Sequence, residues 1–155
     1  MVDVGPIVAL LVVGLILVLL SADSNNERPG HYNRGVLQQT SPEKLRKYVA
    51  ILYENEGYTT EVSRNSAEYI DVVAKSDEEL VAISVRRRQE EDRVSANAVK
   101  RFADSLQKFG ADSAIMVSTS YFTKPARDTA KQSDIKLLNG DELAEHFTKC
   151  NDIPK

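Results

Sequence analysis

The sequence has very little of what holds small secreted or zinc-binding domains together. Its 155 residues include one cysteine, Cys150, and two histidines, His31 and His146. A single cysteine cannot form an intramolecular disulfide, and two distant histidines with one cysteine do not complete a structural zinc site. Nothing around Cys150 looks like the motif of an activated nucleophile, so a nucleophilic role is not indicated either. These scarcities argue against a disulfide framework, a zinc-stabilised fold and a cysteine enzyme.

The chain also lacks a strong excess of charge of either sign. Twenty Lys and Arg residues stand against 23 Asp and Glu residues, which gives a formal net charge of -3 at pH 7. Binding to nucleic acid would therefore depend on a local basic patch rather than on bulk charge. The length leaves room for one globular domain of ordinary core size and one additional segment.

Charged side chains are absent altogether from residues 4–20, the run VGPIVALLVVGLILVLL. As a helix this run spans about 25 Å, slightly less than a hydrocarbon core of about 30 Å, and Ser21 and Ala22 can extend it. We therefore predict a single transmembrane helix over residues 4–22. A cleaved signal peptide is the alternative, but it requires a positive amino-terminal region, and Asp3 is the only charged residue before the run.

Lysine and arginine are missing before this run and frequent after it. By the positive-inside rule, this asymmetry predicts a single-pass membrane protein with its carboxyl-terminal domain in the cytoplasm. Residues 23–40 follow, with Ser, Asn, a Pro-Gly turn signal and no apolar period. We predict a flexible linker there, with His31 and Tyr32 exposed to solvent.

From residue 41 onward the periodicity alternates between that of helices and that of strands. Helix caps, apolar residues at helical spacing and β-branched runs predict the order α-β-β-β-α-β-α-β-α. This order implies a mixed sheet with helices on both faces. The helices are expected over residues 41–57, 95–110, 123–134 and 140–147, and the strands over 58–63, 69–76, 80–87, 113–120 and 135–139.

Three stretches of this domain follow one another in a characteristic order: a helix that ends in EGYTTEV, the strand IDVVAK, and the segment GADSAIMVSTSYFTKPARDTAKQSDIKLLNGDEL. Together they resemble the Mrr-type domain of the restriction-endonuclease-like PD-(D/E)XK nuclease superfamily, over about residues 41–148. The resemblance implies an α/β fold, a restriction-endonuclease-like mixed sheet flanked by helices, over residues 41–149. It also implies cleavage of DNA, often modified DNA, with magnesium.

By this resemblance, the chemistry needs an acid at the start of one strand, an acid or glutamine on the next strand, and a lysine two residues further on. Asp71 matches the first position, but Ile83 falls on the second and Val85 on the third. The family's helix glutamate falls on Arg46. Because Ile and Val cannot bind a metal or carry charge, we predict a domain without catalysis or cofactor. Asp71 is the only candidate metal ligand.

An active magnesium-dependent endonuclease remains the alternative if another carboxylate has replaced a lost ligand. Glu61 and Glu68 are the candidates for such a relocation. A register shift of one residue would not restore the site, because it would place Ala82, Ser84 and Arg86 beside Asp71.

A basic strip follows the third strand and continues into the helices after it. We predict that it binds DNA phosphates at the mouth of the nuclease-like cleft. The alternative is a solvated strand end with weak local ion pairs; pairing of its arginines with Glu90, Glu91 and Asp92 would favour a membrane-tethered protein-interaction module. The predicted DNA-binding residues are Arg86, Arg87, Arg88, Arg93, Lys100, Arg101, Lys124 and Arg127.

Overall fold

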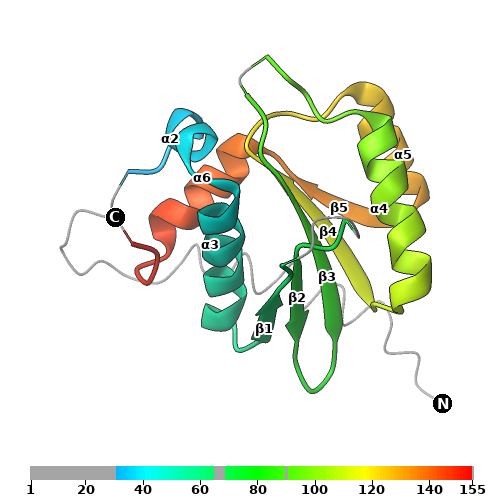
Figure 1. The fold of residues 1–155 in the computed structure, drawn as a ribbon, viewed down its shortest axis with the longest axis horizontal. Helices are drawn as coiled ribbons and strands as arrows, with labels where there is room; N and C mark the ends of the chain where they lie inside the picture. The colour runs from blue at the N-terminus through cyan, green and yellow to red at the C-terminus, as the bar shows by residue number, and fades with distance from the viewer. Residues whose placement is uncertain (1–30, 65–68, 90, 155) are drawn as a thin grey trace.

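The computed structural model describes residues 31–64, 69–89 and 91–154 (Figure 1). The predicted transmembrane segment lies outside these residues, and no helix among those described has the length and apolar character to cross a membrane. The elements are α2 (Arg34–Gln39), α3 (Pro42–Asn55), β1 (Thr59–Val62), β2 (Val72–Lys75), β3 (Leu80–Arg86), α4 (Ala96–Phe109), β4 (Ser113–Ser118), α5 (Lys124–Gln132), β5 (Ile135–Leu138) and α6 (Gly140–Lys149).

The five strands form one mixed sheet in the order β1-β2-β3-β4-β5. The strands β1, β2 and β3 are antiparallel neighbours, whereas β3, β4 and β5 are parallel. A tight turn suffices to join two antiparallel strands. In the turn between β2 and β3, the Ser76 hydroxyl accepts hydrogen bonds from the backbone N–H groups of Glu78 and Glu79. Parallel strands need a crossover, which α4 and α5 supply. The predicted α/β class and element order are confirmed.

Helices cover both faces of the sheet, with α3 and α6 on one face and α4 and α5 on the other (Figure 1). Each face has its own buried core, because successive side chains of a strand point to opposite sides. In β3, Ile83 and Val85 belong to the core under α3 and α6, whereas Ala82 belongs to the core under α4 and α5. Burial on both faces explains the almost continuous apolar sequence of this central strand.

Local signals in the sequence set the helix ends. Ser41 and Thr123 accept hydrogen bonds from backbone N–H groups in the first turns of α3 and α5. Asn139 and Glu142 form a reciprocal capping box at the start of α6. Gly110 ends α4 in the left-handed conformation (φ 73°), which glycine adopts without strain. The caps fix how the loops leave the sheet and therefore where the site residues lie.

The predicted linker over residues 23–40 is corrected by the structure for its second half. Residues 34–39 form α2, whose first turn is capped when Asn33 accepts a hydrogen bond from Val36. Leu37 is fully buried in the core under α3 and α6, and this burial explains why so short a helix is ordered. The domain therefore begins before residue 41, and residues 23–30 lie outside the described part.

Tyr32 is half-buried, although the sequence predicts exposure to solvent. Its backbone N–H donates to the Thr148 hydroxyl of α6 at 3.1 Å. Its ring packs edge-on against Phe147 and Tyr48, with centroids 5.7 and 6.3 Å away. Aromatic contacts of this kind bind the segment before α2 to α6.

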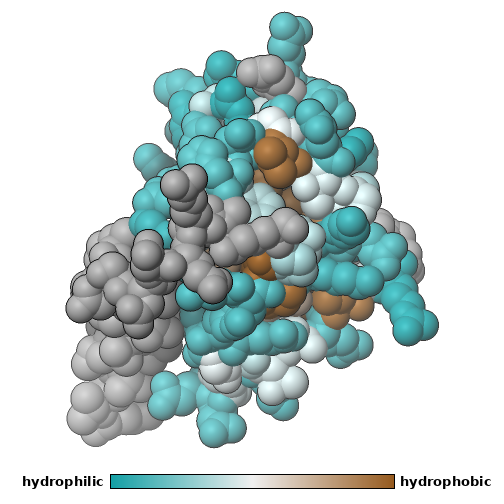
Figure 2. Space-filling model, turned by 90° about the vertical axis from the view of Figure 1, so that its left-hand side faces the viewer, coloured by the Kyte–Doolittle hydropathy of each residue, from teal (hydrophilic) through white to brown (hydrophobic). Residues whose placement is uncertain are grey.

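The side of the molecule shown in Figure 2 is mostly hydrophilic, with small hydrophobic areas between the polar residues.

Candidate functional site

Asp71, the candidate that the sequence indicates, lies at the start of β2. Its carboxylate is almost completely buried, with 3% of the residue exposed. Oδ2 accepts a hydrogen bond of 2.8 Å from the backbone N–H of Val85 on the neighbouring strand. The backbone N–H of Asp71 donates to the carbonyl of Ile83 at 2.9 Å, which extends the β2–β3 pairing by one residue. Asp71 is therefore fixed against β3 by both its backbone and its side chain.

Two arginines flank this carboxylate, and we call Asp71, Arg46 and Arg86 the Asp71 cluster. Arg46 of α3 lies 3.7 Å from Oδ1, and Arg86 at the end of β3 lies 3.7 Å from Oδ2. Their side chains are only 19% and 17% exposed, so water screens these ion pairs weakly. Burial lowers the pKa of Arg86 and the Asp71 carboxylate opposes the shift, but an arginine stays charged at any ordinary pH. The cluster carries two positive charges and one negative charge.

Arg86 has further partners that hold it in place. Its guanidinium donates to the Ser84 hydroxyl at 2.7 Å and to the Tyr69 carbonyl at 3.3 Å. It also stacks over the Tyr69 ring, 4.9 Å from the centroid. Tyr69 has a φ of 57°, a left-handed conformation that is uncommon outside glycine, and Arg101 donates to its hydroxyl at 2.6 Å. Tyr69 thus lies between two arginines beside Asp71.

The residues present do not fit a magnesium ion. Ile83 is fully buried and Val85 is 8% exposed, and both pack in the core under α3 and α6. They cannot supply the oxygen ligand and the lysine that the resemblance calls for at these positions. A divalent cation at Asp71 would also face the positive charges of Arg46 and Arg86. In the part of the chain that the structure describes, no group of three or more His, Cys, Asp or Glu residues could hold a metal.

Two other carboxylates are candidates to replace a missing ligand. Glu61 lies on the edge strand β1, opposite Val73, and is exposed. Glu68 lies outside the described residues. Among the described residues of the acidic loop after β3, Asp92 forms an ion pair with Arg88 at 3.1 Å. No ion pair joins the described acidic residues of this loop to Arg86 or Arg87.

The ends of β3 and β4 are joined by a network around Thr119. The Thr119 hydroxyl accepts from the backbone N–H of Arg88 and donates to its carbonyl, both at 2.8 Å. The Thr119 carbonyl accepts from the Gln38 side chain at 3.3 Å, and the Gln38 carbonyl accepts from Arg87 at 3.2 Å. This network ties α2 to the basic strand end and leaves Arg87 exposed apart from that contact.

A close backbone contact lies under the same network. A side-chain carbon added at Gly140 would lie 2.4 Å from the Thr119 carbonyl oxygen, so the first residue of α6 must be glycine for the two backbones to meet. Tyr121 lies in the loop after β4, next to Thr119 and Ser120. Arg34 stacks over its ring, 4.5 Å from the centroid, and Arg93 lies 5.9 Å from the same centroid. The Tyr121 hydroxyl donates a hydrogen bond to the Asp141 carboxylate.

The remaining basic residues predicted to bind DNA lie on the surface at this end of the sheet. The loop after β3 and the loop after β4 meet there through the Val94–Phe122 bridge (Figure 1). Lys124 pairs with Asp128 at 3.2 Å, and Arg127 donates to the Phe122 carbonyl at 2.7 Å. We call the exposed basic residues of the loop after β3 and of the first two turns of α4 and α5 the basic rim: Arg87, Arg93, Lys100, Arg101, Lys124 and Arg127.

Comparison with known proteins agrees with this geometry. The Mrr catalytic-domain family, described as restriction endonuclease, matches residues 37–147. The chain belongs to this restriction endonuclease family. No curated protein sequence matches the chain.

Solved structures show the same fold. A protein of unknown function, AF1548, is 21% identical with a TM-score of 0.54, covering 62% of this chain and 56% of its own. The MspJI restriction endonuclease in complex with a 27-mer oligonucleotide is 17% identical with a TM-score of 0.53, covering 84% of this chain and 36% of its own. The Mrr-type chain thus spans about half the length of the first protein and about a third of the second.

Sequence reasoning finds Asp71, Ile83 and Val85 but misses the residues that complete the site. It places Gln38 and Arg34 in a linker and Tyr69 in a strand without a further role. One sequence signal could have indicated α2: Leu37 follows the helix cap Asn33, as in a short helix with one buried residue. That helix would bring its neighbouring polar residues to the end of the sheet. Arginine stacking on aromatic rings has no sequence pattern, because the partners come from separate elements.

Proposed function

We propose that this Mrr-type chain is a membrane-anchored DNA-binding protein that has kept the nuclease fold without its catalysis. The observation that carries the proposal is the Asp71 cluster. Arg46 and Arg86 occupy the space around the only carboxylate at the family's catalytic position, and Ile83 and Val85 are core residues. Water activation and stabilisation of a pentavalent phosphate need a metal and a lysine there, and these residues supply neither.

Binding of DNA is supported by the position and accessibility of the basic rim. Its residues lie at the carboxyl ends of the parallel strands β3 and β4, which is where open α/β sheets bind ligands. Lysines and arginines spread over the loop after β3 and the starts of α4 and α5 suit contacts to several phosphates rather than to one base. The MspJI structure holds an oligonucleotide, and this chain shares its fold. We expect weak binding with little sequence preference, because the rim offers phosphate contacts alone.

The membrane anchor is proposed from the sequence of residues 4–20, which has no charged or hydrogen-bonding side chain. The full chain should remain with membranes after an alkaline carbonate wash, because transfer of about 17 apolar residues into hydrocarbon is strongly favourable. Release of the full chain by carbonate, or a mature protein that begins near Ala22, would contradict the anchor. The rest of the proposal would stand.

The experiment on DNA compares two double variants by fluorescence anisotropy over a series of salt concentrations. The first is Arg93→Ala with Lys100→Ala, two exposed residues of the basic rim. The second is Lys75→Ala with Lys108→Ala, exposed lysines at the opposite end of the sheet, which remove the same charge. We expect the first variant to reduce the salt slope by about 1.8, because each neutralised phosphate accounts for about 0.9 of the slope.

The control variant should change the slope little, because removal of distant surface charge affects only the long-range field. Equal effects of the two variants would show that binding depends on net charge and not on the rim. No binding by the wild type at low salt would end the nucleic-acid proposal and favour a protein-interaction module.

A further inference from the structure

A pocket lies on the face of the sheet covered by α3 and α6, away from the basic rim. This α3–α6 pocket has a volume of about 490 Å³, within the range of about 300–1,000 Å³ typical of small-molecule sites. Its apolar lining residues come from α3, β4, β5 and α6. They include Leu52, Ile115, Val117, Leu138 and Leu143.

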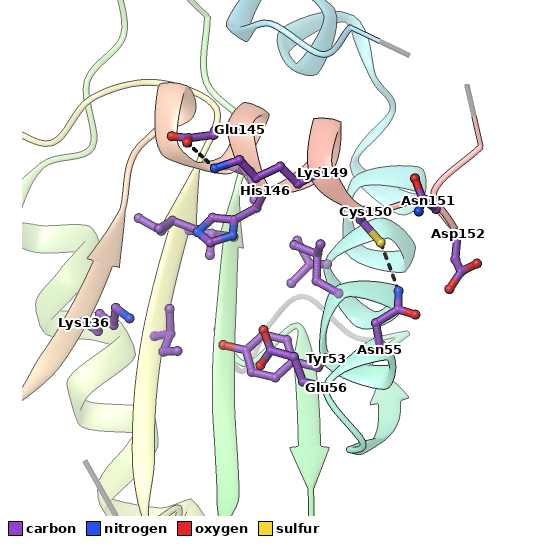
Figure 3. Close-up of a pocket in the computed structure, with 16 residues that line it drawn as sticks. Tyr53, Asn55, Glu56, Lys136, Glu145, His146, Lys149, Cys150, Asn151 and Asp152 are labelled. Atoms are coloured by element: carbon purple, nitrogen blue, oxygen red, sulfur yellow. Dashed lines mark hydrogen bonds and ion pairs between the residues drawn. The ribbon is translucent and has the colours of Figure 1, made fainter. Parts of the chain in front are cut away.

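The pocket is also lined by polar side chains, among them four from three elements (Figure 3). Tyr53 and Glu56 come from α3 and its carboxyl-terminal end, Lys136 from β5, and His146 from α6. In the described part of the chain, the structure gives none of these four side chains a hydrogen bond or an ion pair. The dashed contacts in Figure 3 join other residues, Glu145 with Lys149 and Asn55 with Cys150. The pocket therefore presents polar groups without a direct hydrogen bond or ion pair, and Lys136 and Glu56 interact only through longer-range attraction.

Burial acts on all four groups in the same sense. It raises the pKa of Glu56 and of Tyr53 and lowers the pKa of Lys136 and of His146, in each case against the charged form. Lys136 and Glu56 attract each other across the pocket and partly offset this. Unmatched polar groups of perturbed pKa in an apolar hollow are typical of binding sites.

We infer that the α3–α6 pocket binds a small hydrophobic amino acid, or a zwitterion of that kind. Its apolar side chain would lie against Leu138 and Leu143, its carboxylate toward Lys136, and its ammonium toward Glu56. The two protein charges are opposite in sign and lie on different walls, β5 and the end of α3, so a ligand with both charges can pair with both of them.

Other ligand classes fit the charges less well. A simple carboxylate would give Glu56 no partner and would add a second negative charge near it. A simple amine would give Lys136 no partner and would add a second positive charge near it. A nucleic-acid phosphate is disfavoured, because Glu56, Glu145 and Asp152 all line this pocket and the basic rim is elsewhere. The inference goes beyond DNA binding and does not depend on it.

The test measures binding of free L-leucine to the full chain by titration calorimetry or NMR. Two comparison ligands each lack one charge: 4-methylpentanoate has no ammonium, and 3-methylbutylamine has no carboxylate. Leucine should bind saturably with a dissociation constant of about 1 mM or tighter, and each comparison ligand about tenfold more weakly. Methyl signals of Leu138 and Leu143 should shift on addition of leucine.

Variants of the two charged residues test the assignment of the charges. Glu56→Gln and Lys136→Met should each weaken leucine binding about tenfold, while the exposed controls Glu78→Gln and Lys131→Met should not change it. Thermal melts of each variant distinguish weaker binding to an intact fold from unfolding, and binding of 3-methylbutylamine to Lys136→Met should equal its binding to the wild type. The inference is overturned if leucine does not bind saturably, if 4-methylpentanoate binds as tightly, or if the folded Glu56→Gln and Lys136→Met proteins bind like the wild type.

Discussion

Two polar sites on one sheet differ in how their charges are matched. At the Asp71 cluster, every oxygen of the carboxylate has a partner: Oδ2 accepts from Val85 and pairs with Arg86, and Oδ1 pairs with Arg46. In the α3–α6 pocket, Glu56 and Lys136 are half-buried, and the structure gives neither of them such a partner among the described residues. The first arrangement resembles a structural ion pair, whereas the second resembles a site for a ligand.

The comparison separates two properties: whether a residue takes a position that a family motif marks, and whether its surroundings leave it able to bind a ligand. By the resemblance, Asp71 takes the position of a catalytic acid, and the structure places Arg46 and Arg86 beside its carboxylate. The pocket has no family motif, yet it keeps perturbed groups in an apolar setting. Substitutions should therefore have opposite effects on the free energy of unfolding at the two sites. They should lower it at the Asp71 cluster and raise it in the pocket, because binding groups are commonly held at some cost in stability.

The largest effect is expected from Asp71→Ala. This change leaves Arg46 and Arg86 without their buried counter-charge and the Val85 N–H without an acceptor, so the free energy of unfolding should fall by about 3–5 kcal/mol. Asp71→Asn keeps an acceptor for Val85 and should cost less. Urea denaturation measures both. A stabilising effect of Asp71→Asn would show instead that the carboxylate is held under strain, as in a working metal site.

A smaller decrease in stability is expected when the close approach beneath the Thr119 network is crowded. Gly140→Ala places a methyl group against the Thr119 carbonyl, and overpacking of this kind costs about 1–3 kcal/mol. Gly35→Ala in α2 is the matched control; its added carbon lies 3.2 Å from the Asn33 side chain and should change stability by less than about 1 kcal/mol. Equal thermal midpoints for the two variants would refute the close packing of α6 on the end of β4.

The smallest effect, and one of opposite sign, is expected in the pocket. Lys136→Met removes an ammonium whose charged form the folded state disfavours, since burial lowers its pKa. Below that pKa the penalty is present in full, so the variant should gain stability at pH 7. Solvent screens the partly exposed Lys136, and the variant also loses the attraction between Lys136 and Glu56. We therefore expect the free energy of unfolding to rise by only about 0.5 kcal/mol. A clear decrease in stability in urea denaturation would mean that Lys136 is a structural residue.

Much of the fold could be predicted from the sequence, because its signals are local. Caps at Ser41 and Thr123 and the β-branched runs of the strands mark the elements, and the structure has them in the predicted order. The short helix α2 could not be predicted in this way. Its order depends on the burial of Leu37 and on contacts of Tyr32 with α6, more than 100 residues away in the chain.

The candidate sites were predictable only in part, for the same reason. Asp71, Ile83 and Val85 are assigned from the sequence by the resemblance alone, because the motif orders these positions along the chain. It does not show that Arg46 and Arg86 converge on Asp71, since that depends on how α3 crosses the sheet. The pocket brings together Glu56 and Lys136 from distant elements without any motif, so only the folded chain reveals it.

The central claim is that this Mrr-type domain has lost metal-dependent cleavage. The most direct measurement incubates the full chain with supercoiled plasmid and with magnesium or manganese, and follows nicking on a gel. Our account predicts that the plasmid stays intact, because Asp71 alone cannot hold a catalytic cation between two arginines. Metal-dependent nicking that disappears in a folded Asp71→Asn protein would contradict it.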